Sequence, residues 1–120
     1  AIGVFKKGDN MLDEYIPIIT GKYSVKLKID EIISIEQQLR KVVITTNENC
    51  YSYYGKIANI DKYLDVRFYH CLSRLIINFD KVKEMSAQVI YFENGNFYYI
   101  GKNNYIKTRQ TYSAYLKKML

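Results

Sequence analysis

Residues 70–74, with the sequence HCLSR, place the chain's only histidine beside one of its two cysteines. A cysteine thiolate activated by a neighbouring imidazole is one of the standard enzyme nucleophiles. The surrounding pattern is typical of a strand, however, and successive side chains of a strand point to opposite faces of the sheet. His70 and Cys71 therefore cannot form a hydrogen-bonded pair there. We also find no serine-nucleophile, phosphate-loop or zinc-protease motif, and we predict that the protein is not an enzyme.

The chain also holds too few suitable side chains for a structural metal site. A structural zinc ion takes about four thiolate or imidazole ligands, whereas the chain offers Cys50, Cys71 and His70. We predict no metal and no cofactor. Reduced thiols are expected, with Cys71 as a small buried apolar side chain. A redox-sensitive pair between Cys50 and Cys71 stays open, because the sequence does not place the two residues relative to each other.

Charge favours binding over catalysis. The net charge is +6, and residues 101–120 hold five of the 18 basic residues but none of the 12 acidic ones. A basic terminal block beside a nearly neutral body favours a polyanionic partner such as nucleic acid. The alternative is a solvated helix face that only keeps the protein in solution.

The elements that must position these side chains are mostly strands. Thirteen tyrosines and many isoleucines and valines favour β structure. Residues 23–29 alternate strictly between apolar and polar side chains, as a strand with one buried face does. Similar runs predict further strands at residues 16–20, 32–36, 42–46, 50–54, 67–69, 75–79, 89–92 and 97–100.

Two connections between these strands have specific predictions. Asn94-Gly95 is the strongest hairpin signal in the chain and predicts a type I′ turn, which needs positive φ at both central residues. Residues 37–41 are polar, and we interpret them as a hinge between two strands.

Two helices are expected. Ile57, Ile60 and Leu64 have helical spacing and predict a short helix over residues 57–64. A second helix should begin at Asn103 or Asn104, with an asparagine as its N-cap. Its apolar stripe is expected to consist of Tyr105, Tyr112, Leu116 and Met119.

The predicted fold class is mainly β, an elongated arrangement of short antiparallel β-sheets with a short internal helix and a C-terminal helix. We divide the chain into a linker or N-terminal extension at residues 1–14, a folded binding domain at residues 15–104 and a basic amphipathic helix at residues 105–120. A chain of this length can bury one core without metals or disulfides. No run of about 18 apolar residues occurs, so we predict no membrane span.

Polar and basic side chains gather where the predicted strands end. Arg40 and Lys41 lie in the hinge, residues 70–74 precede a strand, and residues 102–104 follow one. Loops carried by a rigid sheet often hold recognition residues, and arginine, lysine, asparagine and serine suit phosphates and base edges. The tyrosines offer another interpretation, a platform on which the bases of single strands stack.

Four stretches, in this order, carry a family resemblance: IDEIISIEQQLRKVVITT, YYGKIANIDKYL, FYHCLSRLIINFDKVKEM and VIYFENGNFYYIGKNN. Over about residues 23–104 the chain resembles the LytTR DNA-binding domain, the output domain of many bacterial response regulators. The resemblance implies short antiparallel sheets whose loops enter successive DNA grooves.

The resemblance also implies which side chains contact DNA. Arg74 and Lys102 would meet phosphates or guanine edges, and Ser73 a backbone oxygen or a base. The family pattern F-x-R-x-H-x-S is altered, since His70, Leu72 and Arg74 replace its arginine, histidine and serine. A contact at Leu72 would be apolar, for example to a thymine methyl group. The full set of expected contact residues is Arg40, Lys41, His70, Ser73, Arg74, Lys102 and Asn103.

The expected function is therefore sequence-specific binding of duplex DNA by a cytoplasmic transcriptional regulator of a bacterial two-component system. Expected partners are double-stranded DNA and a second copy of the chain in a homodimer. A receiver domain or a sensor kinase is expected upstream if the chain is part of a longer protein. The alternative, motivated by the three replacements, is a protein-interaction or dimerisation module that keeps the fold but has lost its DNA surface. A single-strand binder ranks third.

Overall fold

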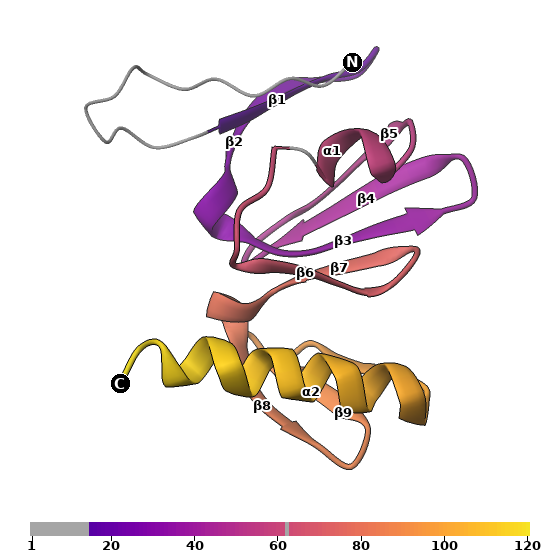
Figure 1. Cartoon of the computed structure of the whole chain (residues 1–120). Coiled ribbons are helices and arrows are strands. Elements are labelled where there is room, and N and C mark those ends of the chain that lie inside the picture. Colours follow the sequence, from indigo (N-terminus) through magenta and orange to yellow (C-terminus); the bar gives the residue numbers. More distant parts are fainter. Residues whose placement is uncertain (1–14, 62) are drawn as a thin grey trace.

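The computed structural model describes residues 15–61 and 63–120, and the expected N-terminal extension at residues 1–14 lies outside them. The described residues form ten strands, two α-helices and two short 3-10 turns (Figure 1). The strands are β1 Tyr15–Ile19, β2 Ser24–Lys28, β3 Ile32–Gln38, β4 Lys41–Thr46, β5 Cys50–Tyr54, β6 Phe68–Leu72, β7 Leu75–Asn78, β8 Val82–Ser86, β9 Val89–Phe92 and β10 Phe97–Tyr99. The helical elements are η1 Ile29–Glu31, α1 Ala58–Asp61, η2 Phe79–Lys81 and α2 Lys102–Lys117.

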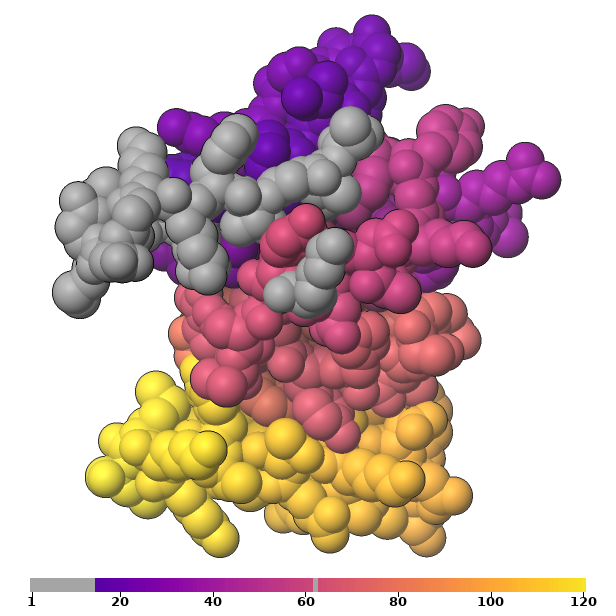
Figure 2. All heavy atoms as spheres, turned by 45° about the horizontal axis from the view of Figure 1, so that its top comes forward, coloured from indigo at the N-terminus to yellow at the C-terminus, as the bar shows by residue number. Residues whose placement is uncertain are grey.

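The strands pair into three antiparallel sheets. A five-stranded sheet has the order β5-β4-β3-β7-β6, a three-stranded sheet has the order β10-β9-β8, and β1 pairs with β2. The five-stranded sheet lies in the middle, with the β1–β2 hairpin and α1 on one side and the three-stranded sheet and α2 on the other (Figure 1). In Figure 2 the yellow and orange atoms of α2 form a band along one end of the molecule. The predicted fold class, mainly β with short antiparallel sheets, an internal helix and a C-terminal helix, is confirmed.

The central sheet separates two hydrophobic cores. One core lies under the β1–β2 hairpin and α1, and the other lies under the three-stranded sheet and α2. Strands β3 and β7 supply side chains to both, because Ile35 and Ile76 face the first core while Ile33 and Ile77 face the second. This two-sided burial explains why their sequences, IISI and LIIN, are apolar runs with little alternation.

The turns differ from the sequence-based expectation. The expected hinge at residues 37–41 is a tight hairpin, because β3 pairs with β4 up to Gln38 opposite Lys41 and only two residues turn. The prediction of a type I′ turn at Asn94-Gly95 is wrong, since only Gly95 of the two residues has a positive φ, at 96°. The two-residue turn with positive φ at both positions is Ala87-Gln88, between β8 and β9. Neither residue is a common choice there, so the sequence carried no turn signal and β8 was not predicted.

Helix α2 also begins earlier than expected. Its N-cap is Gly101, without a side-chain hydrogen bond, so no asparagine caps it. Of the expected stripe, Tyr112 is buried and Tyr105 half-buried, whereas Leu116 and Met119 are exposed. The side chains that instead complete the packed face are Thr108, which is fully buried, and Tyr115, whose hydroxyl bonds the Asp80 carboxylate.

A β-bulge shapes the strand that carries the histidine. His70 pairs with Ile76 and Leu72 pairs with Leu75, so Cys71 is the extra residue between them. Because a bulge breaks the two-residue alternation, Cys71 and Leu72 both pack into the core next to α2. Cys71 is buried, as expected, and burial raises the pKa of its thiol to about 12.

A polar contact ties the three-stranded sheet to the central one. The Tyr98 hydroxyl donates to Glu36 Oε1 at 2.8 Å and accepts from Ser34 Oγ at 2.8 Å. Ser34 is buried, and burial raises the pKa of the Tyr98 phenol well above its ordinary value. Since Tyr98 lies on β10 and its two partners lie on β3, the contact fixes how these strands sit against each other.

We predict that Tyr98→Phe lowers the free energy of unfolding by about 1–3 kcal/mol, because it leaves a carboxylate and a buried hydroxyl without their shared partner. Urea denaturation measures the change. Tyr99→Phe is the matched control, since the neighbouring Tyr99 is 69% exposed, and it should leave the unfolding midpoint unchanged. Equal midpoints for the Tyr98→Phe variant and the wild type would show that the contact contributes nothing.

The two thiols should react very differently with iodoacetamide at pH 8. Cys50 is exposed on β5 and Cys71 is buried on β6, at the opposite edge of the same sheet. Mass spectrometry of the native protein should show one rapidly added group, and Cys50→Ser should remove it. Both thiols should react in the denaturant-unfolded protein. Rapid labelling of native Cys50→Ser would contradict the packing of the bulge.

Candidate nucleic-acid interface

Two hairpin turns lie side by side at one end of the central sheet. The β3–β4 turn is Leu39-Arg40 and the β6–β7 turn is Ser73-Arg74. The turns are adjacent because β3 pairs with β7 and the backbone N–H of Gln37 donates to the backbone carbonyl of Arg74 at 2.9 Å. All four turn residues are exposed.

Gln37 holds the first turn in place. Its Nε2 donates to the carbonyl oxygens of Leu39 at 2.9 Å, Lys41 at 3.1 Å and Gly55 at 3.0 Å. Its Oε1 accepts from the Ile57 amide at 2.7 Å. Sequence reasoning did not single out Gln37, because a glutamine in a polar stretch gives no signal of the backbone groups it will meet.

Lys41 follows the first turn and is exposed. Its Nζ lies 5.1 Å from the ring centroid of Tyr54, the residue opposite it on β5. A cation over an aromatic ring is held in a preferred place without losing its charge. Lys41 therefore presents a positioned ammonium group beside the turn.

The start of α2 forms a third exposed segment. Lys102, Asn103 and Asn104 make up its first turn, which contains no acidic residue. The first intrahelical bond joins the Tyr105 amide to the Gly101 carbonyl, so the amides of the preceding helical residues have no partner within the helix. Free amides and the helix dipole favour an anion at this end.

The chain brings this third segment to the same side as the two turns. The Tyr98 hydroxyl holds β10 to β3. The residue after β10, Ile100, makes two hydrogen bonds with Gln88. The Ile100 backbone amide donates to the Gln88 carbonyl at 3.0 Å, and Gln88 Nε2 donates to the Ile100 carbonyl at 3.1 Å. Figure 1 shows both turns and the orange start of α2 toward the right of the molecule. We call this surface the loop face, and it consists of Leu39, Arg40, Lys41, Ser73, Arg74, Lys102, Asn103 and Asn104.

Of the expected contact residues, His70 does not belong to the loop face. It lies within β6, and its Nε2 is 3.1 Å from Asp61 Oδ1 of α1. Leu72, where an apolar contact such as one to a thymine methyl group is expected, is half-buried against the core next to α2. The other expected residues, Arg40, Lys41, Ser73, Arg74, Lys102 and Asn103, come together on the loop face.

The loop face has an uncompensated positive charge within the described residues. Among residues 15–61 and 63–120, ion pairs join Arg67 to Asp65 at 2.8 Å and His70 to Asp61 at 3.1 Å, and neither includes a residue of the loop face. The hydrogen-bonded Arg67 guanidinium lowers the pKa of the Asp65 carboxyl, so that pair is compensated within the protein. The cations of the loop face are instead left to solvent or a ligand.

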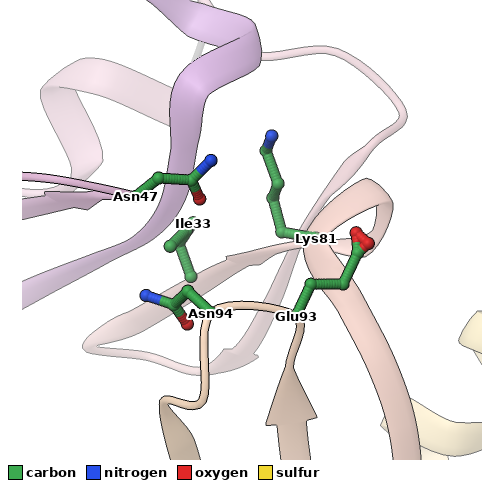
Figure 3. Close-up of a pocket in the computed structure, with 5 residues that line it drawn as sticks. All are labelled: Ile33, Asn47, Lys81, Glu93 and Asn94. Carbon is green, nitrogen blue, oxygen red and sulfur yellow. The ribbon is translucent and has the colours of Figure 1, made fainter.

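The other end of the central sheet carries a small pocket of about 150 Å³. Figure 3 shows its lining residues, Ile33, Asn47, Lys81, Glu93 and Asn94. It lies where β3 begins and β4 ends, so it is not part of the loop face. Among residues 15–61 and 63–120, no three side chains of the metal-binding types come together. No helix in the described part of the chain is long and apolar enough to cross a membrane.

Comparison with known proteins identifies the family. The model of the LytTr DNA-binding domain matches residues 22–120. A solved structure with a similar fold is the LytTr DNA-binding domain of a Bacillus cereus protein described as a methyl-accepting/DNA response regulator. It has a TM-score of 0.68 and 13% sequence identity, over 81% of this chain and 94% of that chain. No curated protein matches the sequence. The family match covers most of the chain, and the protein belongs to the LytTR DNA-binding domain family.

Proposed function

We propose that the chain binds duplex DNA in a sequence-specific manner, as the output domain of a bacterial transcriptional regulator, and that the loop face is its contact surface. The observation that carries the proposal is the loop face itself. Segments from three separate parts of the sequence place exposed basic and amide side chains toward the same end of the molecule (Figure 1). Family membership supports duplex DNA as the ligand.

The chemistry of each segment assigns its role. Arg40 and Arg74 end two-residue turns, so their guanidinium groups can reach phosphates or the O6 and N7 acceptors of guanine. Lys102 offers a single ammonium group beside the free amides of α2, an arrangement suited to a phosphate. Ser73 and Asn103 can donate to or accept from base edges.

Binding should weaken steeply with salt, because each neutralised phosphate contributes about 0.9 log units of affinity per log unit of salt concentration. Lys102→Ala should reduce the slope by about one unit. Lys118→Ala is the matched control, since it removes the same charge at the other, exposed end of α2. Fluorescence anisotropy with a duplex selected from a random library, measured between low and physiological salt, gives both slopes.

Two outcomes would contradict the proposal. The wild type would show no binding to a pool of random duplexes at low salt, or Lys118→Ala would reduce the slope as much as Lys102→Ala. The second outcome would place the DNA elsewhere or reduce the effect to net charge alone.

The second candidate function is self-association through the three-stranded sheet. Tyr91 and Phe97 pair across β9 and β10, with ring centroids 6.4 Å apart, and Phe97 and Tyr99 are 63% and 69% exposed. Exposed aromatic side chains grouped on one face favour a protein contact. Sedimentation velocity distinguishes this candidate from the first. It requires a dimer that persists in high salt, that the Phe97→Ser substitution weakens, and whose formation is unaffected by added DNA.

A further inference from the structure

Leu39 is the apolar side chain at the tip of the β3–β4 hairpin. It is 97% exposed, and its backbone has φ of 58°. Its neighbour in the turn is Arg40, and the Ser73-Arg74 turn lies beside it. An apolar side chain thus projects from the middle of a polar, basic surface.

The fold gains nothing from leucine at this position. The left-handed region costs a leucine about 1–2 kcal/mol, whereas asparagine or glycine adopts it readily in a hairpin turn. The exposed side chain buries almost no apolar area that would offset this cost. The hydrogen bonds that hold the turn run from Gln37 to backbone carbonyls, so they do not depend on the side chain of residue 39.

The geometry of the hairpin fits one particular ligand group. The major groove of B-DNA, about 12 Å wide, admits a two-stranded β-ribbon. Strands β3 and β4 are inner strands of the sheet, but the Leu39-Arg40 turn joins only these two neighbouring strands, so its tip is no wider than such a ribbon. The C5-methyl group of thymine is the apolar feature of that groove. Leu72 cannot reach it, since its side chain packs against the core next to α2. Leu39 is the exposed apolar side chain of the loop face.

We propose that Leu39 is a specificity-determining residue that packs against a thymine methyl group in the major groove, with Arg40 and Arg74 holding the adjacent backbone or base edges. This inference rests on the proposed DNA-binding function. It adds a preference for thymine at one base pair of the target, made by apolar contact instead of a hydrogen bond.

The test removes the methyl group from the DNA and the apolar side chain from the protein, separately and together. In a duplex selected from a random library, each thymine is replaced in turn by deoxyuridine, and dissociation constants are measured for the wild type and Leu39→Asn. One replacement should weaken wild-type binding about fourfold, the effect of one buried methyl group. The same replacement should leave Leu39→Asn unaffected, and this variant should bind the thymine duplex more weakly than the wild type does.

Two controls separate recognition from folding. Leu39→Asn should keep or raise the melting temperature, because asparagine tolerates the backbone conformation of residue 39. Val66→Asn, a change at a site that is 82% exposed outside the loop face, should leave every dissociation constant unchanged. The inference is overturned if the wild type binds the selected duplex but the effect of every deoxyuridine is the same in Leu39→Asn. Absence of any bound duplex would instead overturn the proposed function, and the inference with it.

Discussion

Strands β3 and β7 pair at the centre of the five-stranded sheet, and both bury side chains on both faces. A fully buried isoleucine contributes about 1.5–3 kcal/mol relative to an exposed one, and this pair of strands carries several. A slip of one residue would exchange the side chains of the two cores, so the register of β3 against β7 is strongly specified. Because β3 leads into one hairpin turn and β7 follows the other, the register of this pair places the two turns side by side.

The third segment of the loop face depends on a different interaction. The start of α2 follows β10, and β10 is held to β3 by the Tyr98 hydroxyl between Ser34 and Glu36. A hydrogen bond needs its donor and acceptor at a defined distance and angle, so the two bonds of the Tyr98 hydroxyl set the position of β10 against β3. The loop face is therefore built by two kinds of constraint, apolar register within the central sheet and a polar contact between sheets.

Pattern and family resemblance were enough to predict the mainly β fold, most of the strands and the two helices. The failures share a physical cause, which is that local conformation was decided by tertiary contacts. The bulge at Cys71 turned Leu72 into the core against the alternation of the strand. Gly101 is the N-cap of α2 although it has no side chain that could accept a capping hydrogen bond, and β10 ends two residues before it.

The expected contact residues show the same division. Those at turns could be located from the sequence, since turn residues are exposed whatever the packing around them. His70 could not, because its environment depends on α1, which supplies Asp61 from a separate element. Gln37 and Leu39 belong to no sequence pattern. The structure shows that the Gln37 side chain donates to backbone carbonyls and that the Leu39 side chain is exposed.

The central claim is that DNA meets this protein at the loop face. Backbone amide chemical shifts, followed by NMR while a selected duplex is added, test it most directly. The account predicts that the largest changes fall at residues 39–41, 73–74 and 102–104, with little change in β1, β2 and the β4–β5 turn. Changes centred on the pocket at the other end of the sheet, or on the exposed aromatic side chains of β9 and β10, would contradict it.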